Sequence, residues 1–538
     1  MYVISRISEQ FGFFAGLSLL VSFSFPAFAQ STTDSLPPGA IRQLGLPGDM
    51  QSSTLPSIRA LAFSPDGRWL AMRGEPADPS QPRKIQIWET QSWKISRTLV
   101  GHQTRMGDIG FSLDGRFIVA AQPEHGAGLQ IWNRQTGQKR LQLDGGRGRI
   151  HFLPDGRLAV VAAFGKNDVI RIHDLQTGNE VQRYVIDQNY KFSFSDDGSK
   201  ILAVRTEGRS IVRLIELNSG KTLLQLDDKQ SQPSAMTLSP DGRTVAIASS
   251  TRSLRGKATH QIVVWEVATG EKVYELTQHS GRILTIAFSP DGKFLATGSL
   301  DRTVRIWELA TGELSKTFQG HRGPVSALAF SRNGELLASG SFDKTVLIWN
   351  ATGARKSFLP DRPIDNRTME SIWNDLASPT PAKAYRVIGR IASARGNAIG
   401  QLKERVTSIL IPAQNRRIQQ LIVELDDDDS IVRQRAMKEL RKLRKIGRSI
   451  LLKTMKTTTS AEVRYRIRRI LADTEDAPRF SKADVRRMLR AIHAAEAVGG
   501  PDAEAMLKLM IKDFPLPAVT ESAKKALKLL ETRRKSTN

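Results

Sequence analysis

Short apolar stretches alternate with one recurring polar turn along the first two thirds of the chain. A phrase close to Ser-Pro-Asp-Gly-Arg follows an apolar residue seven times, at spacings of 41 to 50 residues. Proline fixes φ, aspartate binds its own backbone and glycine adopts a positive φ, so the phrase predicts a tight turn between two strands. The copies start at Phe63, Phe111, Phe152, Phe194, Leu238, Phe288 and Phe330.

A second apolar strand recurs about twenty residues after each turn. It usually ends in tryptophan, and a Thr-Gly or Ser-Gly turn such as Thr311-Gly312 usually follows it. The pattern predicts units of four strands. Because a four-stranded sheet cannot bury both of its faces alone, we expect similar sheets to stack radially. These strands, the later of the two that the pattern shows in each unit, end at Trp88, Trp132, His173, Glu216, Trp265, Trp307 and Trp349.

These units resemble the blades of WD-repeat β-propellers, most closely in the last two, which contain GSLDRTVRIW and GHRGPVSALAFSRNGELLASGSFDKTVLIW. The resemblance covers about residues 41–358 and implies an all-β seven-bladed propeller. His173 and Glu216 replace the usual tryptophan, and the family's Gly-His pair survives clearly only at Gly101-His102 and Gly320-His321, with Gln278-His279 close to it. The third to fifth blades are therefore degenerate. The family also has a structural His–Ser/Thr–Asp–Trp network, which the resemblance assigns to His279, Asp301, Trp307, His321, Asp343 and Trp349. A catalytic triad is disfavoured there, because the same set recurs in several blades.

Two segments are candidates for the strand that closes the ring. Residues 354–359 follow Thr352 and Gly353 as a fourth strand would, whereas residues 41–44 precede the first blade and also read as a fourth strand. The family that the blades resemble usually closes its ring with an N-terminal strand. We therefore favour residues 41–44.

The periodicity becomes helical after Asp361. From Met369, apolar residues recur at spacings of three and four, and caps and breakers divide the segment into several helices. The phrase DDDDSIVRQRAMKELRKL from Asp426 resembles a HEAT repeat, and SAEVRYRIRRIL from Ser460 resembles a partial second copy. We predict an all-α, HEAT-like helical-hairpin domain at residues 369–538, joined by a linker at residues 360–368 to a propeller at residues 41–359.

The first thirty residues have the pattern of a targeting segment. Arg6 precedes an apolar stretch that ends in Ala27-Phe28-Ala29, and small residues at these positions suit signal peptidase. The stretch is also long enough to span a bilayer, so an uncleaved anchor is the alternative. We predict a signal peptide at residues 1–29, a linker at residues 30–40 and an exported bacterial type of protein, which is periplasmic, cell-surface or secreted.

Composition excludes several kinds of chemistry. The chain has 538 residues and no cysteine, so it has no disulfide, thiolate zinc site or cysteine nucleophile. It also lacks a phosphate-binding loop, a nucleophile elbow, an HExxH motif and a calcium loop, and the acidic run at residues 426–429 suits a helix N-terminus. We therefore predict no enzymatic activity, no cofactor and no bound metal.

Positive charge exceeds negative charge along the chain. It has 79 Lys and Arg against 54 Asp and Glu, a formal net charge of +25. The densest run of cations lies at residues 433–469, and both a solvated helix face and an anion-binding face fit it. Nucleic acid is disfavoured as a partner, because export is expected and Tyr465 is the only aromatic residue in the run.

Cations also recur at near-equivalent loop positions of several blades. In a WD-like blade, the loops that lead to the next blade and those that join the second and third strands emerge on one side of the disc. We predict that these cations bind an acidic protein partner. They are Arg105, Arg149, Arg282 and Arg322 in the first kind of loop, and Arg252, Arg255 and Lys257 in the loop at residues 249–260.

The function that we favour is a non-catalytic protein-protein interaction scaffold of the cell envelope or exterior. It would dock a partner on the propeller face, and the basic helices offer a second surface. Two alternatives stay open: an exported propeller enzyme or ligand binder that uses the central funnel, and a surface polyanion-binding protein.

Overall fold

The structure is a computed structural model that describes residues 36–45, 57–75, 83–100, 107–121, 128–143, 150–153, 155–164, 167–186, 190–195, 198–205, 210–217, 219–228, 232–252, 258–351, 363–394, 397–410, 412–443, 448–472, 481–513 and 516–537. The predicted signal peptide at residues 1–29 and the candidate strand at residues 354–359 lie outside the described residues. Part of each predicted linker lies outside them as well.

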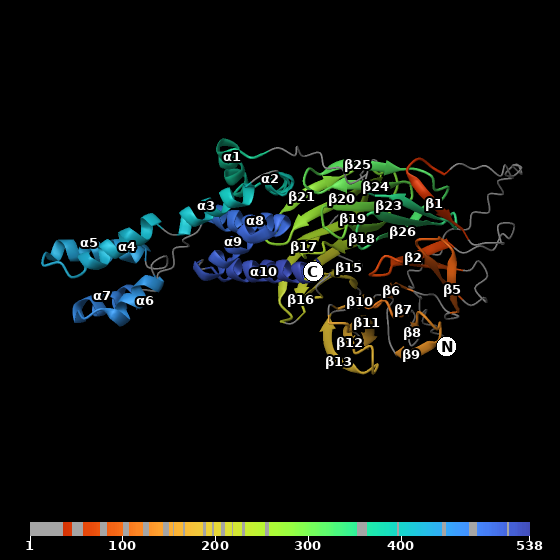
Figure 1. Cartoon of the computed structure of the whole chain (residues 1–538), viewed down its shortest axis with the longest axis horizontal. Coiled ribbons are helices and arrows are strands. Elements are labelled where there is room, and N and C mark those ends of the chain that lie inside the picture. Colours follow the sequence, from red (N-terminus) through yellow and green to blue (C-terminus); the bar gives the residue numbers. More distant parts are fainter. Residues whose placement is uncertain are drawn as a thin grey trace, which may run out of the picture.

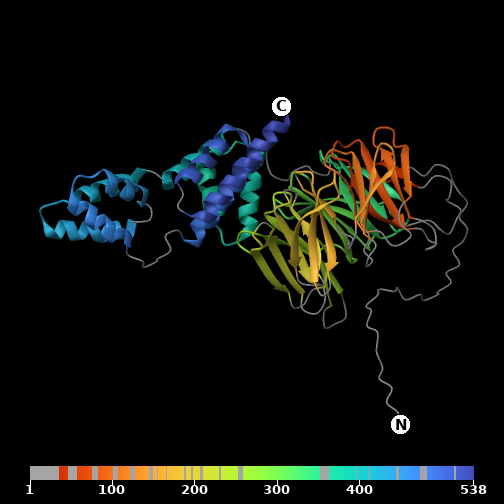
Figure 2. The same cartoon turned by 90° about the horizontal axis from the view of Figure 1, so that it is seen from below.

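The described strands form seven four-stranded antiparallel sheets arranged as the blades of a propeller (Figures 1 and 2). A region of ten described helices follows it. The predicted fold class, an all-β seven-bladed propeller followed by an all-α region, is therefore confirmed. Each blade contains one copy of the recurring turn between its first two strands.

The first four blades use strands β2 to β17. Blade 1 has β2 (Ser57–Phe63), β3 (Trp69–Glu75), β4 (Lys84–Glu89) and β5 (Ile95–Val100), and blade 2 has β6 (Ile109–Phe111), β7 (Phe117–Ala121), β8 (Leu129–Asn133) and β9 (Lys139–Leu143). Blade 3 has β10 (Ile150–Phe152), β11 (Leu158–Phe164), β12 (Asn167–His173) and β13 (Glu180–Ile186), and blade 4 has β14 (Tyr190–Phe194), β15 (Lys200–Arg205), β16 (Ser210–Glu216) and β17 (Thr222–Asp228).

The last three blades complete the ring. Blade 5 has β18 (Gln232–Leu238), β19 (Thr244–Arg252), β20 (Ala258–Glu266) and β21 (Lys272–Leu276), and blade 6 has β22 (Ile283–Phe288), β23 (Phe294–Ser299), β24 (Val304–Glu308) and β25 (Glu313–Phe318). Blade 7 combines β26 (Val325–Phe330), β27 (Leu336–Ser341) and β28 (Val346–Asn350) with β1 (Ala40–Leu44).

The recurring turns owe their shape to a short hydrogen-bonded loop. In blade 1, the Ser64 hydroxyl donates to Asp66 Oδ1 at 2.5 Å, and the Trp69 backbone N–H donates back to Ser64 Oγ at 2.9 Å. Gly67 follows with a φ of 70°, a left-handed conformation that glycine adopts without a steric cost. Blade 6 repeats the serine–aspartate bond at 2.5 Å. The turn chemistry read from the sequence is therefore present in the fold.

The N-terminal strand closes the ring. β1 pairs antiparallel with β28, with Leu44 opposite Val346 and Ala40 opposite Trp349. Leu44 is 2% exposed and packs against Ile58 of blade 1. The favoured alternative for closure is confirmed. β1 thus supplies the outer, fourth strand of blade 7, and its last residue packs against blade 1.

The helical region begins at Asn366, where the Asp365 side chain accepts a hydrogen bond from the backbone N–H of Thr368. Its helices are α1 (Asn366–Leu376), α2 (Pro381–Ser393), α3 (Ala398–Leu410), α4 (Pro412–Glu424), α5 (Ser430–Leu443), α6 (Arg448–Thr457), α7 (Ala461–Ala472), α8 (Lys482–Val498), α9 (Gly500–Asp513) and α10 (Pro517–Thr537). None of these helices, within the described part of the chain, is long and apolar enough to cross a membrane.

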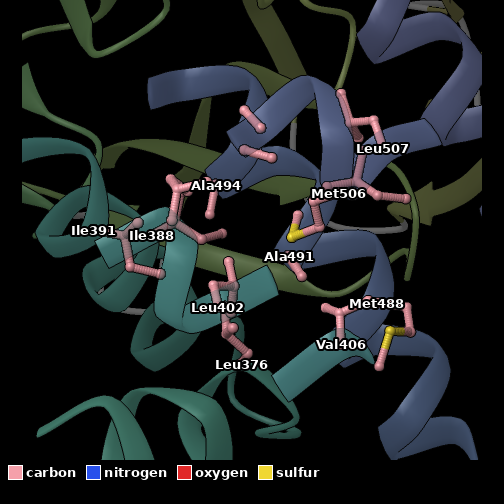
Figure 3. Close-up of a cluster of buried hydrophobic side chains, with 14 of the residues drawn as sticks. Leu376, Ile388, Ile391, Leu402, Val406, Met488, Ala491, Ala494, Met506 and Leu507 are labelled. Atoms are coloured by element: carbon pink, nitrogen blue, oxygen red, sulfur yellow. The ribbon is translucent and has the colours of Figure 1, made fainter. Parts of the chain in front are cut away.

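These helices have two separate hydrophobic cores. The first core unites α1, α2, α3, α8, α9 and α10, and Figure 3 shows part of it, including Leu376, Leu402 and Met488. The second core belongs to α4–α7 and includes Leu421, Leu440 and Ile467. We call the first group the inner helical unit and the second the outer helical unit. Both views show the inner unit against the propeller and the outer unit farther away (Figures 1 and 2).

Candidate interaction surfaces

The blades present their turns on two opposite faces. The upper face, as we define it, carries the turns that lead to the next blade and those between the second and third strands. The lower face carries the turns between the first and second strands and between the third and fourth. His279 precedes β22 and contacts Asp301, which follows β23, so the two kinds of upper-face turn lie side by side in blade 6.

A buried hydrogen-bond network holds the upper face of blade 6. His279 Nδ1 lies 2.7 Å from Asp301 Oδ2, and His279 Nε2 lies 2.7 Å from Thr297 Oγ1. The indole N–H of Trp307 donates to the same threonine oxygen at 3.0 Å. The His279 side chain is fully buried and Trp307 is 1% exposed, so the network has no access for a substrate.

Blade 7 repeats the network with serine in place of threonine. His321 Nδ1 lies 2.9 Å from Asp343 Oδ2, and His321 Nε2 lies 2.7 Å from Ser339 Oγ. Trp349 is fully buried, and its indole N–H donates to Ser339 Oγ at 2.7 Å. The structure thus brings together all six network residues that the resemblance implied, three in each blade.

The network aspartates remain charged and fix their loops. Burial alone would raise the pKa of Asp301, but hydrogen bonds from His279 and Thr303 outweigh it and hold this pKa well below its ordinary value. Asp343 has the same balance, with His321 and Thr345 as the donors. Each carboxylate therefore clamps the turn between the second and third strands of its blade.

Each clamped turn exposes an apolar side chain that sequence reasoning missed. Leu300 immediately precedes Asp301 and is 43% exposed, and Phe342 immediately precedes Asp343 and is 36% exposed. The guanidinium of Arg59 lies 4.4 Å from the centre of the Phe342 ring. In the sequence, an apolar residue directly before each network aspartate could have indicated these exposed side chains. On rigid turns, such side chains offer anchors for a protein partner.

The predicted cationic positions are described only in part. Arg282 and Arg322 lie in upper-face turns of blades 6 and 7, and Arg322 is exposed. Burial and the nearby charge of Arg282 lower the pKa of His260 on β20, so Arg282 lies close to the blade 5 hairpin. Four predicted residues lie outside the described residues: Arg105, Arg149, Arg255 and Lys257. Arg252 is the last residue of β19, and nothing is described of its side chain.

The lower face carries the inner helical unit through charged contacts, of which the Arg490–Glu266 pair is buried. Arg490 of α8 is 1% exposed, and its Nε and Nη2 donate to the two carboxylate oxygens of Glu266 at 3.1 and 2.8 Å. Its Nη1 donates to the carbonyl oxygen of Ser378 at 2.7 Å. Lys525 of α10 pairs with Glu216 of blade 4 at 3.2 Å. Because a two-pronged guanidinium–carboxylate contact fixes orientation, α8 is aligned on blade 5.

Three further side chains complete this contact. Tyr385 of α2 is 7% exposed and joins the hydrophobic core shared by blades 5 and 6. Its ring meets the ring of His493 at 5.6 Å between centres. Arg243 of blade 5 pairs with Glu496 of α8 at 2.5 Å. The helices thus cover part of the lower face.

The docking of α8 should weaken in acid because of His493. Burial and the charge of Arg243 lower the pKa of His493 to about 4 from an ordinary 6.5, although Asp241 and Glu266 act in the opposite direction. Between pH 6.5 and about 4, His493 therefore binds a proton in the unfolded chain but not in the folded chain. We expect the free energy of unfolding to keep its full value above pH 6.5 and to fall by on the order of 3 kcal/mol, because of His493, as the pH falls to about 4. Melting curves against pH test this, and a His493→Gln variant with the same acid slope as the parent would contradict it.

The central channel contains a cavity of about 420 Å³ that is open toward the lower face. First strands of the blades line it, with side chains that include Asp108, His151 and Phe194. Within the described part of the chain, no group of three or more histidines and carboxylates is arranged to hold a metal ion.

Comparison with known proteins agrees with the local geometry. The WD40 family model, described as "WD domain, G-beta repeat", matches residues 270–308 and 312–350. These are the stretches that contribute the aspartates and tryptophans of the two hydrogen-bond networks. The matched repeats are therefore the blades in which the network is complete.

Relatives and solved structures show wider but weaker similarity. The chain is 24% identical over 254 residues to a periodic tryptophan protein 2 homolog of Dictyostelium discoideum, covering 46% of this chain and 26% of the relative. It is 25% identical over 226 residues to protein FIZZY-RELATED 1 of Arabidopsis thaliana, covering 41% of this chain and 45% of the relative. The matches thus span less than half of either relative. A chain of Kuenenia stuttgartiensis hydrazine synthase is 17% identical with a TM-score of 0.49, covering 57% of this chain and 99% of that chain.

WD40 propellers related to this chain are generally non-enzymatic and commonly bind protein partners. The resemblance read from the sequence is supported for the propeller by the matched repeats and by the seven sheets. The chain contains WD40 repeats as part of a seven-bladed β-propeller.

Proposed function

We propose that this chain is a non-catalytic docking platform that binds an acidic protein partner on the upper face of blades 6 and 7. The observation that carries the proposal is the pair Leu300 and Phe342, two exposed apolar side chains on turns that the buried networks hold rigid. A rigid apolar anchor costs little conformational entropy when a partner binds. Arg302 and Arg322 are exposed beside these anchors and favour an acidic partner.

Capture of the partner from native cells tests this function. The double change Leu300→Asp and Phe342→Asp should reduce capture by at least tenfold, because it replaces both anchors with charges that an acidic partner repels. The matched control is Val181→Asp with Val185→Asp, two exposed apolar residues on β13 of blade 3. Equal capture by the two double variants, both folded, would contradict the proposal.

Export belongs to the same proposal. The apolar stretch that ends in Ala27-Phe28-Ala29 supports a cleaved signal peptide, and the lack of cysteine is compatible with an oxidising compartment. The platform would then act in the periplasm, at the cell surface or in the medium. Fractionation of native cells with a C-terminal tag, followed by N-terminal sequencing, tests both the location and cleavage before Gln30.

The outer helical unit supports a HEAT-like interpretation. Arg433 of α5 donates to the carbonyl oxygen of Asp427 at 2.7 Å, and Arg464 of α7 donates to that of Thr458 at 2.6 Å. Each arginine thus binds the carbonyl six residues before it, in two successive helical hairpins. The Ser460 hydroxyl also donates to Asp426 at 2.9 Å and links the two hairpins. We propose that α4–α7 are two HEAT-like repeats.

A second candidate function, polyanion binding, rests on the exposed cations of these repeats. Arg435 and Lys438 are exposed on α5, and Arg468 and Arg469 are exposed on α7, which packs against α5. Positive groups on adjacent helices attract a polyanion in a manner that salt screens. Reversing Arg468 and Arg469 to Glu should lower the salt concentration that elutes the chain from heparin. The same elution for the parent and this variant would exclude α7 as the binding surface.

A further inference from the structure

A second cavity lies between the propeller and the inner helical unit. Its volume is about 780 Å³, within the range of small-molecule sites, which often form between domains. Lower-face turns of blades 5–7 form one wall, and α2 and the C-terminal half of α8 form the other. We call this cavity the interdomain cleft. It is distinct from the upper face on which we propose that the partner docks.

The helical wall of the interdomain cleft is mainly apolar. Ile388 and Ala392 of α2 and Ala497 of α8 line it, and Leu309 and Phe294 of blade 6 face the same space. Ile388 is 4% exposed and Phe294 is 3% exposed, so Ala392 and Ala497, which are partly exposed, present more of the accessible apolar surface. The cleft therefore offers a surface for the apolar body of a ligand.

The carboxylates that line the cleft already have partners. Glu496 pairs with Arg243 at 2.5 Å, and Asp241 accepts from the Ser239 hydroxyl at 2.5 Å and lies 3.6 Å from His493. Asp291 of blade 6 accepts from the Ser289 hydroxyl at 2.5 Å, and Glu308 accepts from the Thr311 hydroxyl at 2.9 Å. Arg243 therefore neutralises Glu496, whereas the serine and threonine hydroxyls occupy lone pairs of Asp241, Asp291 and Glu308 without cancelling their charge.

Two cations at the cleft have no such partner. Lys293 and Arg332, from lower-face turns of blades 6 and 7, line the cleft, and neither side chain has a hydrogen bond or ion pair with any residue that the structure describes. Both residues are exposed. Arg332, Pro240 and Pro290 also line the cavity of the central channel, so the two cavities share a border. The two cations without a partner thus lie where the cleft meets the channel mouth.

We propose that the interdomain cleft binds a small organic anion, with its charged head at Lys293 and Arg332 and its apolar body against α2. An anionic head suits this end of the cleft, because Lys293 and Arg332 are the lining charges without a hydrogen bond or ion pair among the residues that the structure describes. A guanidinium and an ammonium suit a carboxylate, sulfonate or phosphate head. The apolar wall adds affinity for a ring or a short alkyl chain.

The test uses the full chain and two fluorescent probes that differ in one group. The anionic probe 8-anilino-1-naphthalenesulfonate carries a sulfonate, and the neutral probe N-phenyl-1-naphthylamine lacks it. We expect the anionic probe to bind at least tenfold more tightly than the neutral one. The change Lys293→Ala with Arg332→Ala should weaken the anionic probe by about tenfold or more, the effect of losing charge-assisted hydrogen bonds.

Steric and charge controls make the outcome decisive. Ala392→Phe should fill the apolar part of the cleft and abolish binding of the anionic probe. Ala461→Phe, at an exposed position of α7, should leave that binding unchanged. Lys316→Ala, an exposed lysine on β25, removes a charge of the same kind away from the cleft and should change nothing. Melting curves confirm that each variant is folded. Equal affinity for the two probes, or binding that is indifferent to Ala392→Phe, overturns the proposal.

Discussion

Replacing Glu266 with alanine is expected to lower the free energy of unfolding by about 3–5 kcal/mol, because it leaves the charge of Arg490 buried with only Glu271, 4.0 Å from Nη2, as a carboxylate neighbour. Arg490 is 1% exposed and Glu266 is 4% exposed, so water cannot replace the lost partner. Two backbone carbonyls, those of Leu376 and Ser378, remain as acceptors for Nη1. Chemical denaturation of the full chain measures the loss.

Two controls separate this buried pair from an ordinary surface charge. Glu275→Ala removes an exposed partner of Lys272 on the same blade, and exposed pairs contribute about 0–1 kcal/mol. The double change Glu266→Leu with Arg490→Met removes both buried charges and should recover most of the stability, as apolar replacement of buried pairs often does. If Glu266→Ala costs no more than Glu275→Ala, the ion pair does not hold α8 on the propeller.

Replacing Trp349 with alanine should cost about 3–5 kcal/mol, since it empties a fully buried site. The ring stacks on Phe318 with 4.6 Å between centres, and its N–H reaches Ser339 at the base of the blade 7 network. Trp349 also lies opposite Ala40 in the pairing that closes the ring. The cavity would therefore weaken the network and ring closure together. Thermal and chemical unfolding provide the measurement.

Trp88 offers a matched control for the hydrogen bond. It occupies the position of Trp349 in blade 1, but its indole N–H has no hydrogen-bond partner in the structure as described. Met72 stands there where blade 7 has Ser339. Trp349→Phe should therefore cost about 1–2 kcal/mol more than Trp88→Phe. Equal costs would show that the network adds nothing to the stability of blade 7.

Much of the propeller could be predicted because its determinants are local. The turn phrase after Phe63 and its six later copies require only neighbouring residues to form, and periodic apolar strands follow each copy. Closure by residues 41–44 could also be predicted, since this segment resembles the fourth-strand phrases that begin at Arg97 and Lys316 and the resembled family usually closes its ring with an N-terminal strand. The hydrogen-bond networks were implied by the resemblance to WD repeats, which assigns equivalent residues in blades 6 and 7.

The contacts between propeller and helices could not be predicted in this way. Glu266 and Arg490 are 224 positions apart and belong to elements with unrelated patterns. A signal existed in α8, where Arg490 and Glu496 interrupt an alanine-rich stretch whose other residues are mostly buried. The sequence pattern alone gave no choice between a solvated charge and a buried one. The division of the helices into inner and outer units was missed for the same reason, because both have helical periodicity.

The central claim is that a partner docks on the upper face of blades 6 and 7, and site-specific photo-crosslinking tests it most directly. A benzophenone side chain at position 342 should crosslink one partner in living cells, and the same group at position 185, an exposed apolar site on blade 3, should not. Reversing Arg282 and Arg322 to Glu should lower the yield at position 342 several-fold, because an acidic partner would then be repelled. Equal yields at positions 342 and 185, or no product at 342, would contradict the account.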